Sequence, residues 1–197
     1  MSSSKISSEN YNKQFKEKEE IFNSYFSEIT TKNIFPSIYH SFRHRCEFGV
    51  LNSDHGIKYS MIKDNERVEI DKYPICSESI QTLMEQLLNI VNQEEVLYRK
   101  LFQIEFQSSR SKEAMVSLIY HKKLGSDWTE KANLIKDNLK CSVIGRSKKQ
   151  KLVIGQDYVT EEYKSTNQNF KLNLYEQCFS QTNPDICDQI INWVEEI

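Results

Sequence analysis

Apolar residues recur at helical spacing in several parts of the chain. A helix carries apolar side chains every three or four residues along the face that it buries. This spacing predicts four helices: one capped by Ser8, one that starts at Ser77, one capped by Ser126 or Asp127, and one that starts at Pro184 with Asn183 as its cap. The inward positions expected in the first helix are Tyr11, Phe15, Phe22, Tyr25, Phe26 and Ile29. In the second helix they are Ile80, Leu83, Met84, Leu87, Leu88 and Val91. In the last helix they are Ile186, Ile190, Trp193, Val194 and Ile197.

Alternating apolar and polar residues predict strands between these helices. The stretch SFRHRCEFGVL places Phe42, His44, Cys46, Phe48 and Val50 on one face and Arg43, Arg45 and Glu47 on the other. Further strands are expected at residues 57–62, 68–70, 100–106, 114–120, 142–146, 150–154, 157–163 and 170–174, with turns at NSDHG, KDNER and RSKK. The strand at 114–120 is almost entirely apolar, which indicates a central position. Hairpins with helices gathered beside them predict an α+β fold with an antiparallel sheet.

Composition limits the possible functions. The chain has 197 residues, 38% of them hydrophobic and 27% charged, which is typical of a globular protein with one large domain or one and a half. A net charge of −2 gives no overall attraction to nucleic acid, so any RNA binding must come from local patches. No apolar run approaches the roughly 20 residues that span a bilayer, and the first twenty residues contain no secretory signal. We therefore expect a cytoplasmic protein without a membrane partner.

The five cysteines are odd in number and scattered, at Cys46, Cys76, Cys141, Cys178 and Cys187. With no CxxC pair, we expect reduced thiols that act mostly as small core residues. A metal site is not expected, because the four histidines do not lie at ligand spacing beside the cysteines. Cys46 shares a strand face with His44, which leaves two interpretations: packed side chains, which we favour, or a nucleophile.

Three short stretches are basic and contain no acidic residue: residues 43–45, 121–123 and 146–151. Such groups hold phosphates, and a nearby aromatic ring can stack on an unpaired base. Phe102 is the candidate for that ring. The alternative is a solvated surface for the lysines and a core position for Phe102. No phosphate-binding loop, catalytic serine motif or dinucleotide motif is present, so the residues alone predict a binding surface without chemistry.

Several stretches, taken in order, resemble one family. They are SFRHRCEFGV, EIDKYP, KLFQIEF, VSLIYHKKL, IGRSKKQK, GQDYV and FSQTN, and they extend from about Tyr11 to the last residue. The chain resembles the tRNA (uracil-5-)-methyltransferases of the TrmA type. This resemblance implies formation of 5-methyluridine in the T-loop of tRNA with S-adenosylmethionine as donor, and bacterial members also act on tmRNA. DNA is not an expected partner.

The resemblance also implies roles for individual residues. Phe102 matches the phenylalanine that stacks on the T-loop. The basic positions that match RNA contacts are Arg43, Arg45, His121, Lys122 and Arg146. Gln181 matches the glutamine whose amide reaches the methionine moiety of S-adenosylmethionine. Two alternatives stay open: Gln181 as a cap of the last helix, and Lys122 as a solvated lysine.

Two positions depart from the family. Gly49 stands where relatives can carry arginine, which puts one RNA contact in doubt. The connection between Leu139 and Ser142 is also shorter than in the family.

The last helix raises the question of domain organisation. It ends on Glu195 and Glu196, which sit badly at the negative end of a helix dipole, and then on an apolar residue. Spacing alone favours a simple C-terminal helix that packs on the core, whereas the alternative is a protein that continues. In the family, FSQTN precedes a Rossmann-like methyltransferase domain that carries the nucleophilic cysteine and the carboxylate base. The resemblance thus predicts an RNA-recognition domain at 1–178 and the start of the methyltransferase domain at 179–197.

None of the five cysteines lies in the family's catalytic motif, so no catalytic residue is expected in this chain. Two functions remain open from the sequence. One is the RNA-recognition portion of a methyltransferase, inactive by itself. The other is a free-standing RNA-binding module without transferase activity.

Overall fold

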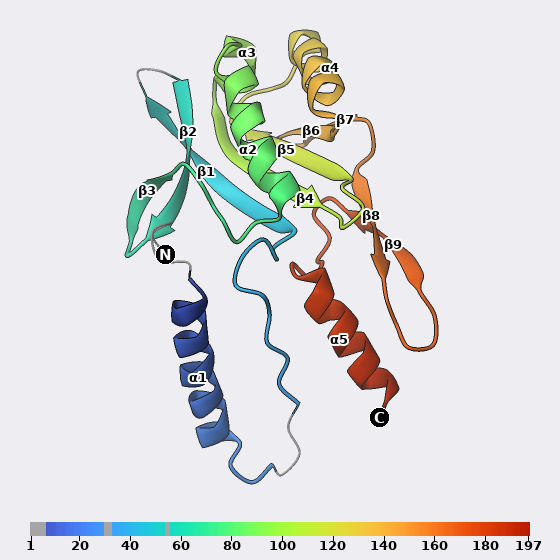
Figure 1. The fold of residues 1–197 in the computed structure, drawn as a ribbon. Coiled ribbons are helices and arrows are strands. Elements are labelled where there is room, and N and C mark those ends of the chain that lie inside the picture. Colours follow the sequence, from blue (N-terminus) through green and yellow to red (C-terminus); the bar gives the residue numbers. More distant parts are fainter. Residues whose placement is uncertain (1–6, 30–32, 54–55) are drawn as a thin grey trace.

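A seven-stranded sheet forms the centre of the structure, a computed structural model that describes residues 7–29, 33–53 and 56–197 (Figure 1). Its strand order is β3-β2-β1-β4-β5-β6-β7. The strands are β1 (Arg45–Ser53), β2 (Gly56–Lys63), β3 (Glu66–Ile70), β4 (Leu101–Ser108), β5 (Ala114–Tyr120), β6 (Ser142–Ser147) and β7 (Gln150–Ile154). The predicted α+β class is confirmed, and β5 lies inside the sheet as expected.

The sheet is antiparallel except at one pair. β5 and β6 run parallel, with Met115 opposite Ser142. A parallel pair needs a crossover connection, and α4 (Ser126–Leu139) supplies it between these two strands. The expectation of a purely antiparallel sheet is therefore wrong at β5–β6. The meander of β1, β2 and β3 is confirmed, although Asp54 and His55 of its first turn lie outside the described residues.

Three helices cover one face of the sheet: α2 (Glu78–Val91), α3 (Glu95–Tyr98) and α4 (Figure 1). The predicted inward positions of α2 are buried, apart from the half-buried Leu88. Ser77 caps α2 by accepting the Ile80 amide at 3.3 Å. At α4 the cap position belongs to Gly125 and no side chain caps the helix, so the prediction of Ser126 or Asp127 is wrong.

A separate two-stranded sheet lies beside the central one. It consists of β8 (Tyr158–Tyr163) and β9 (Phe170–Tyr175), both near the predicted positions. Val159 and the half-buried Leu174 pack against Met115 and Ile144, on the sheet face opposite the helices. The chain then enters α5 (Pro184–Glu195), where Asn183 accepts the Ile186 amide at 3.2 Å and is the predicted cap.

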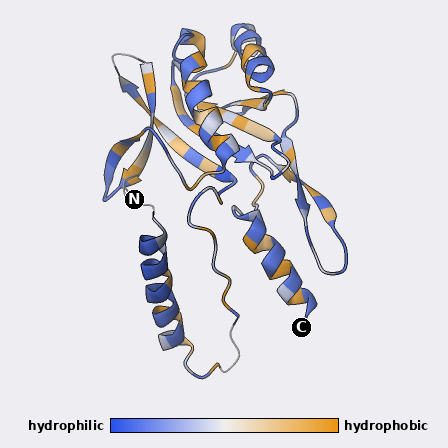
Figure 2. Ribbon diagram, in the orientation of Figure 1, coloured by the Kyte–Doolittle hydropathy of each residue, from blue (hydrophilic) through white to orange (hydrophobic). Residues whose placement is uncertain are grey.

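Two helices extend away from the sheet, α1 (Ser8–Tyr25) and α5 (Figure 1). No residue of α1 is buried, so the predicted inward face is wrong, and its cap is Ser7 rather than Ser8. Figure 2 shows hydrophobic residues along α5, where Trp193 is 38% exposed and Val194 58% exposed. The interpretation in which α5 packs its whole apolar face on the core is therefore wrong for the second half of the helix.

The cysteines correct another expectation. Cys46 and Cys76 form a disulfide, with their Cα atoms 6.9 Å apart, so these two are not reduced thiols. They meet because the segment before α2 runs beside the start of β1, where the Ser77 amide donates to the Arg43 carbonyl at 2.8 Å. The disulfide also removes Cys46 as a candidate nucleophile. Cys141 is buried, and its burial raises the pKa of the thiol to about 12.

Two features are absent from the described residues. No helix there has the length and apolar character that a membrane span requires. No group of His, Cys, Asp and Glu side chains in the same residues is arranged to hold a metal ion.

Candidate nucleic-acid interface

A hollow of about 870 Å³ opens where the ends of β4 and β5 meet the β6–β7 turn. We call it the basic hollow; the residues of its lining that matter below are Phe102, His121, Lys122, Arg146, Lys148 and Lys149. Four of the six predicted RNA-binding residues line it, although they come from β4, from β6 and from the segment that follows β5. The structure thus brings Phe102, His121, Lys122 and Arg146 to one place.

Two aromatic rings form a platform in the basic hollow. The rings of Phe102 and His121 are stacked, with centroids 3.9 Å apart and an interplanar angle of 9°. Phe102 is half-buried and His121 is exposed, so Phe102 is not a fully buried core residue. The pairing of β4 with β5 shifts register between Leu101 and Gln103, which takes Phe102 out of the regular alternation. A stacked pair of this kind presents a flat π-surface to a ligand.

Buried hydrogen bonds support the wall behind this platform. The Tyr120 hydroxyl donates to the Leu97 carbonyl at 2.7 Å and accepts from the Trp128 indole at 2.9 Å. Burial raises the pKa of Tyr120 far above its usual value, so this hydroxyl keeps its proton. Gln150 pairs through its side-chain amide with both backbone groups of Leu124 at 2.9 Å. The sequence pattern did not single out these supporting residues.

The lysines of the basic hollow differ in what they can bind. Lys122 donates from Nζ to the Val96 carbonyl at 2.7 Å and lies 5.4 Å from the Tyr120 ring centroid. Burial lowers the pKa of Lys122, and the interpretation of it as a simply solvated lysine is wrong. Lys148 and Lys149 are exposed in the β6–β7 turn and have no ion pair within the described part of the chain. Lys123, which is exposed and also lines the hollow, is likewise without an ion pair in the described residues, so these three lysines are free to meet a phosphate.

Arg146 lines the basic hollow and also forms an ion pair with a buried carboxylate. Its guanidinium pairs with the carboxylate of Glu176 at 3.2 Å, and the Glu176 side chain is only 2% exposed. Lys151 approaches the other oxygen of the same carboxylate at 3.3 Å. A buried carboxylate needs such partners, so Arg146 has a structural role whatever else it binds.

Arg43 and Arg45 do not join the basic hollow. Arg43 donates from Nε to the Arg45 carbonyl at 3.0 Å, and Arg45 donates to the Cys178 carbonyl. Arg45 thereby holds the segment that leads to α5. The two arginines thus lie apart from the platform and are not brought together with Phe102.

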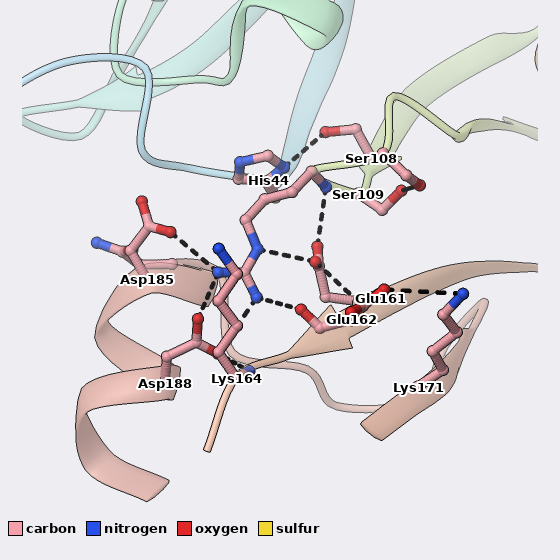
Figure 3. Close-up of polar contacts among 12 residues, drawn as sticks. His44, Ser108, Ser109, Glu161, Glu162, Lys164, Lys171, Asp185 and Asp188 are labelled. Carbon is pink, nitrogen blue, oxygen red and sulfur yellow. Dashed lines mark hydrogen bonds and ion pairs between the residues drawn. The ribbon is translucent and has the colours of Figure 1, made fainter. Parts of the chain in front are cut away.

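A second charged cluster was missed by sequence reasoning (Figure 3). Arg110, in the β4–β5 turn, binds Glu161 at 2.9 Å, Asp188 at 2.5 Å and Asp185 at 3.1 Å. These carboxylates lie on β8 and α5, so one guanidinium joins three elements. Its partners are 51 to 78 residues away in sequence, and no local pattern around Arg110 could have revealed them.

His44 binds the segment that precedes α5, residues 180–183. Its amide donates to the Thr182 carbonyl at 2.7 Å, and its ring nitrogen Nδ1 lies 3.1 Å from the Ser108 hydroxyl oxygen (Figure 3). Burial lowers the pKa of the imidazole, which keeps the ring neutral at pH 7. The position of residues 180–183 is therefore set by the central sheet.

Comparison with known proteins identifies the family. The family model described as tRNA (Uracil-5-)-methyltransferase matches residues 10–197. The chain belongs to this family. A tRNA/tmRNA (uracil-C(5))-methyltransferase of Acinetobacter baumannii (strain ACICU) is 35% identical over 191 residues, which are 93% of this chain and 53% of the relative. A protein of the same description from Wolinella succinogenes is 37% identical over 191 residues, 93% of this chain and 52% of that relative.

A solved methyltransferase structure shares the fold. It is the crystal structure of Pyrococcus abyssi tRNA (uracil-54, C5)-methyltransferase in complex with S-adenosyl-L-homocysteine, with a TM-score of 0.70 and 16% identity. The match covers 94% of this chain and 48% of that chain. At this identity the likeness establishes the fold alone. The chain spans about half the length of the curated relatives that it matches.

Family membership makes Gln181 a residue to test against S-adenosylmethionine. Its side chain is exposed, and with His44 and Arg45 it lines a hollow of only about 10 Å³. Sites that enclose a ligand of this size usually measure 300–1,000 Å³. The residues around Gln181 therefore do not form a cofactor site by themselves. Gln181 is not the cap of α5 either, because Asn183 fills that position.

Proposed function

We propose that the chain is the RNA-recognition portion of a tRNA (uracil-5-)-methyltransferase that forms 5-methyluridine in the T-loop of tRNA, with tmRNA as a further substrate. The observation that carries this proposal is the Phe102–His121 platform inside the basic hollow. In this proposal residues 1–178 hold the T-arm. Residues 179–197 begin the methyltransferase domain, whose donor is S-adenosylmethionine.

Each part of the basic hollow has a task in this function. Phosphates of the stem bind Lys148 and Lys149, and these contacts position the RNA without reading its sequence. An unstacked loop base lies on the aromatic pair, which offers a face to any base. Arg146 and Lys122, already engaged with protein groups, add positive potential at the rim. Arg43 and Arg45 contact RNA outside this hollow.

A free-standing RNA-binding module is the second candidate function. The feature that favours it is the completeness of the basic hollow, since the side chains that form it lie between residues 102 and 150. Binding of a hairpin agrees with both candidates. They differ in whether a methyltransferase domain acts on the RNA that this chain holds.

Binding measurements test the proposed RNA face. We expect a T-arm hairpin to bind more tightly than a plain duplex of the same stem, because only the hairpin offers an unstacked base. Lys148→Gln should weaken both RNAs alike and reduce the slope of log affinity against log salt by about 1. Fluorescence anisotropy at several salt concentrations measures both effects. Lys63→Gln, which removes an equal charge on β2, is the matched control.

Methyl transfer by these 197 residues is not expected. Cys46 and Cys76 are joined, and burial raises the pKa of both Cys141 and Cys187, which disfavours their thiolates. Cys178 is exposed but does not line the basic hollow. Incubation with unmethylated T-arm RNA and tritiated S-adenosylmethionine should leave no tritium in the RNA. Label in the RNA would contradict this expectation, and its loss in Cys178→Ser would identify that thiol as the nucleophile.

A further inference from the structure

A second hollow of about 390 Å³ lies beside β1 and β2, past the point where their pairing ends at Gly49 and Ser60, and residues from both faces of the sheet line it. The residues of its lining that matter here are Arg43, Glu47, Gly49, Ser60, Arg67 and Gln103, so we call it the arginine hollow. It is separate from the basic hollow and takes its residues from β1, β2, β3 and β4 and from the segment before β1.

The two hollows are neighbours on one surface. Strand pairing aligns Gly49 with Gln103, Gln103 with Ile119, and Ile119 with Arg146. Aligned residues of neighbouring strands point to the same face, and neighbouring strands are about 4.8 Å apart. Gly49 in one hollow is therefore about 14 Å from Arg146 in the other. β4 contributes Phe102 to the basic hollow and the next residue, Gln103, to the arginine hollow.

The floor of the arginine hollow contains an unsatisfied hydroxyl. Ser60 is 1% exposed, and its Oγ has no hydrogen-bond partner within the described part of the chain. A buried hydroxyl without a partner is unfavourable, and such a group in a hollow indicates a ligand that would satisfy it. Gly49 leaves room beside the hydroxyl, because a Cβ at this position would lie 2.9 Å from the Ser60 Oγ.

The charges around the hollow define the chemistry of that ligand. The Arg67 guanidinium carbon lies 3.9 Å from the position of a Cβ on Gly49, and Arg67 has no ion pair or hydrogen bond with the described residues. Arg43 uses only its Nε, in the bond to the Arg45 carbonyl. Two guanidinium groups that are free to donate suit a phosphate, which accepts forked hydrogen bonds.

One acidic group faces the same space. Glu47 accepts from the Gln103 amide at 3.3 Å, and that amide also donates to Glu105 at 3.1 Å. A carboxylate disfavours a free phosphate but accepts a hydrogen bond from a ribose hydroxyl. The combination of two arginines, one carboxylate and one serine hydroxyl therefore matches a ribonucleotide better than it matches an inorganic anion.

We propose that the arginine hollow binds one ribonucleotide of the same RNA whose loop base lies on Phe102. This inference rests on the proposed function. The phosphate of the nucleotide binds Arg67 and Arg43, and its ribose lies toward Glu47. When the Arg67 side chain turns toward the phosphate, it uncovers the Ser60 hydroxyl, which then donates a hydrogen bond to the nucleotide. The sheet face then carries two nucleotide subsites rather than one.

Arg67→Gln is the test of this subsite. We expect it to weaken T-arm hairpin binding roughly tenfold and to reduce the salt slope by about 1. Lys63→Gln, on the same β2–β3 hairpin but outside the arginine hollow, should change affinity by less than about twofold. Anisotropy titrations of the two variants and the wild type at matched salt concentrations provide the comparison.

Ser60→Ala separates a ligand-binding role from a structural one. If the hydroxyl serves only the folded protein, the variant should leave hairpin affinity unchanged. We expect instead that affinity falls several-fold while the melting temperature stays equal or rises, because an unsatisfied buried group has been removed.

The outcomes distinguish the subsite from the function on which it rests. If Arg67→Gln and Ser60→Ala bind like the wild type while Phe102→Ala binds weakly, the arginine hollow is not a subsite and the proposed function stands. If the wild type does not bind the hairpin at all, both proposals are overturned.

Discussion

Arg110→Ala is expected to lower the free energy of unfolding by about 3–5 kcal/mol. The guanidinium is the ion-pair partner of Glu161, whose side chain is 2% exposed, and it also binds Asp188 and the exposed Asp185. Its removal leaves the buried Glu161 carboxylate without a counter-charge, and this accounts for most of the expected loss in the free energy of unfolding. Urea unfolding followed by circular dichroism measures the loss.

Two further variants control this experiment. Arg99→Ala removes an arginine whose pair with Glu95 is exposed on both sides, so we expect a loss of at most about 1 kcal/mol. Arg110→Lys keeps the charge but not the forked geometry, and should lie between Arg110→Ala and the wild type. If Arg110→Ala unfolds at the same urea concentration as Arg99→Ala, the cluster does not stabilise the fold.

Phe102→Ala is expected to cost about 1–3 kcal/mol of binding to a T-arm hairpin and almost nothing with a plain duplex. The alanine variant removes half of the aromatic pair on which the loop base is proposed to stack, while the lysines that bind phosphate remain. The difference between hairpin and duplex affinity should therefore disappear. Competition titrations with both RNAs measure this difference in affinity directly.

The control for this variant is Phe22→Ala, a phenylalanine that is 42% exposed on α1. It should bind both RNAs like the wild type. The fold should survive Phe102→Ala because Phe102 is only half-buried. If the variant unfolds, or if it still prefers the hairpin, Phe102 is a packing residue and the recognition face lies elsewhere.

The strands and most helices could be predicted because their signals are local. The alternation around Phe48 predicted which face of β1 is buried, Ser77 was correctly predicted at the start of α2, and Asn183 was correctly predicted as the cap of α5. Two of the failures have long-range causes. The parallel pair β5–β6 depends on where α4 returns the chain, and the disulfide depends on β1 meeting the segment before α2.

The candidate site shows the same division. Basic stretches in the sequence indicated the two sides of the basic hollow, but they could not show which cations are already engaged. Arg146 has the buried Glu176 as a partner from a distant turn, and Lys122 donates to a carbonyl of α3. The exposed Lys123, Lys148 and Lys149 remain, and only three-dimensional packing distinguishes them from Arg146 and Lys122.

The pairing of β1 with β4 has a consequence for how the chain folds. The meander β1–β3 and the unit β4–β7 are each built from segments close in sequence, whereas β1 and β4 are separated by residues 54–100. Joining them closes a long loop, and such closure must precede the contacts that compensate for its entropy. The two parts can therefore form early and separately, and the docking of β1 on β4 is expected to limit the folding rate. The arginine hollow, which needs both parts, exists only after that step.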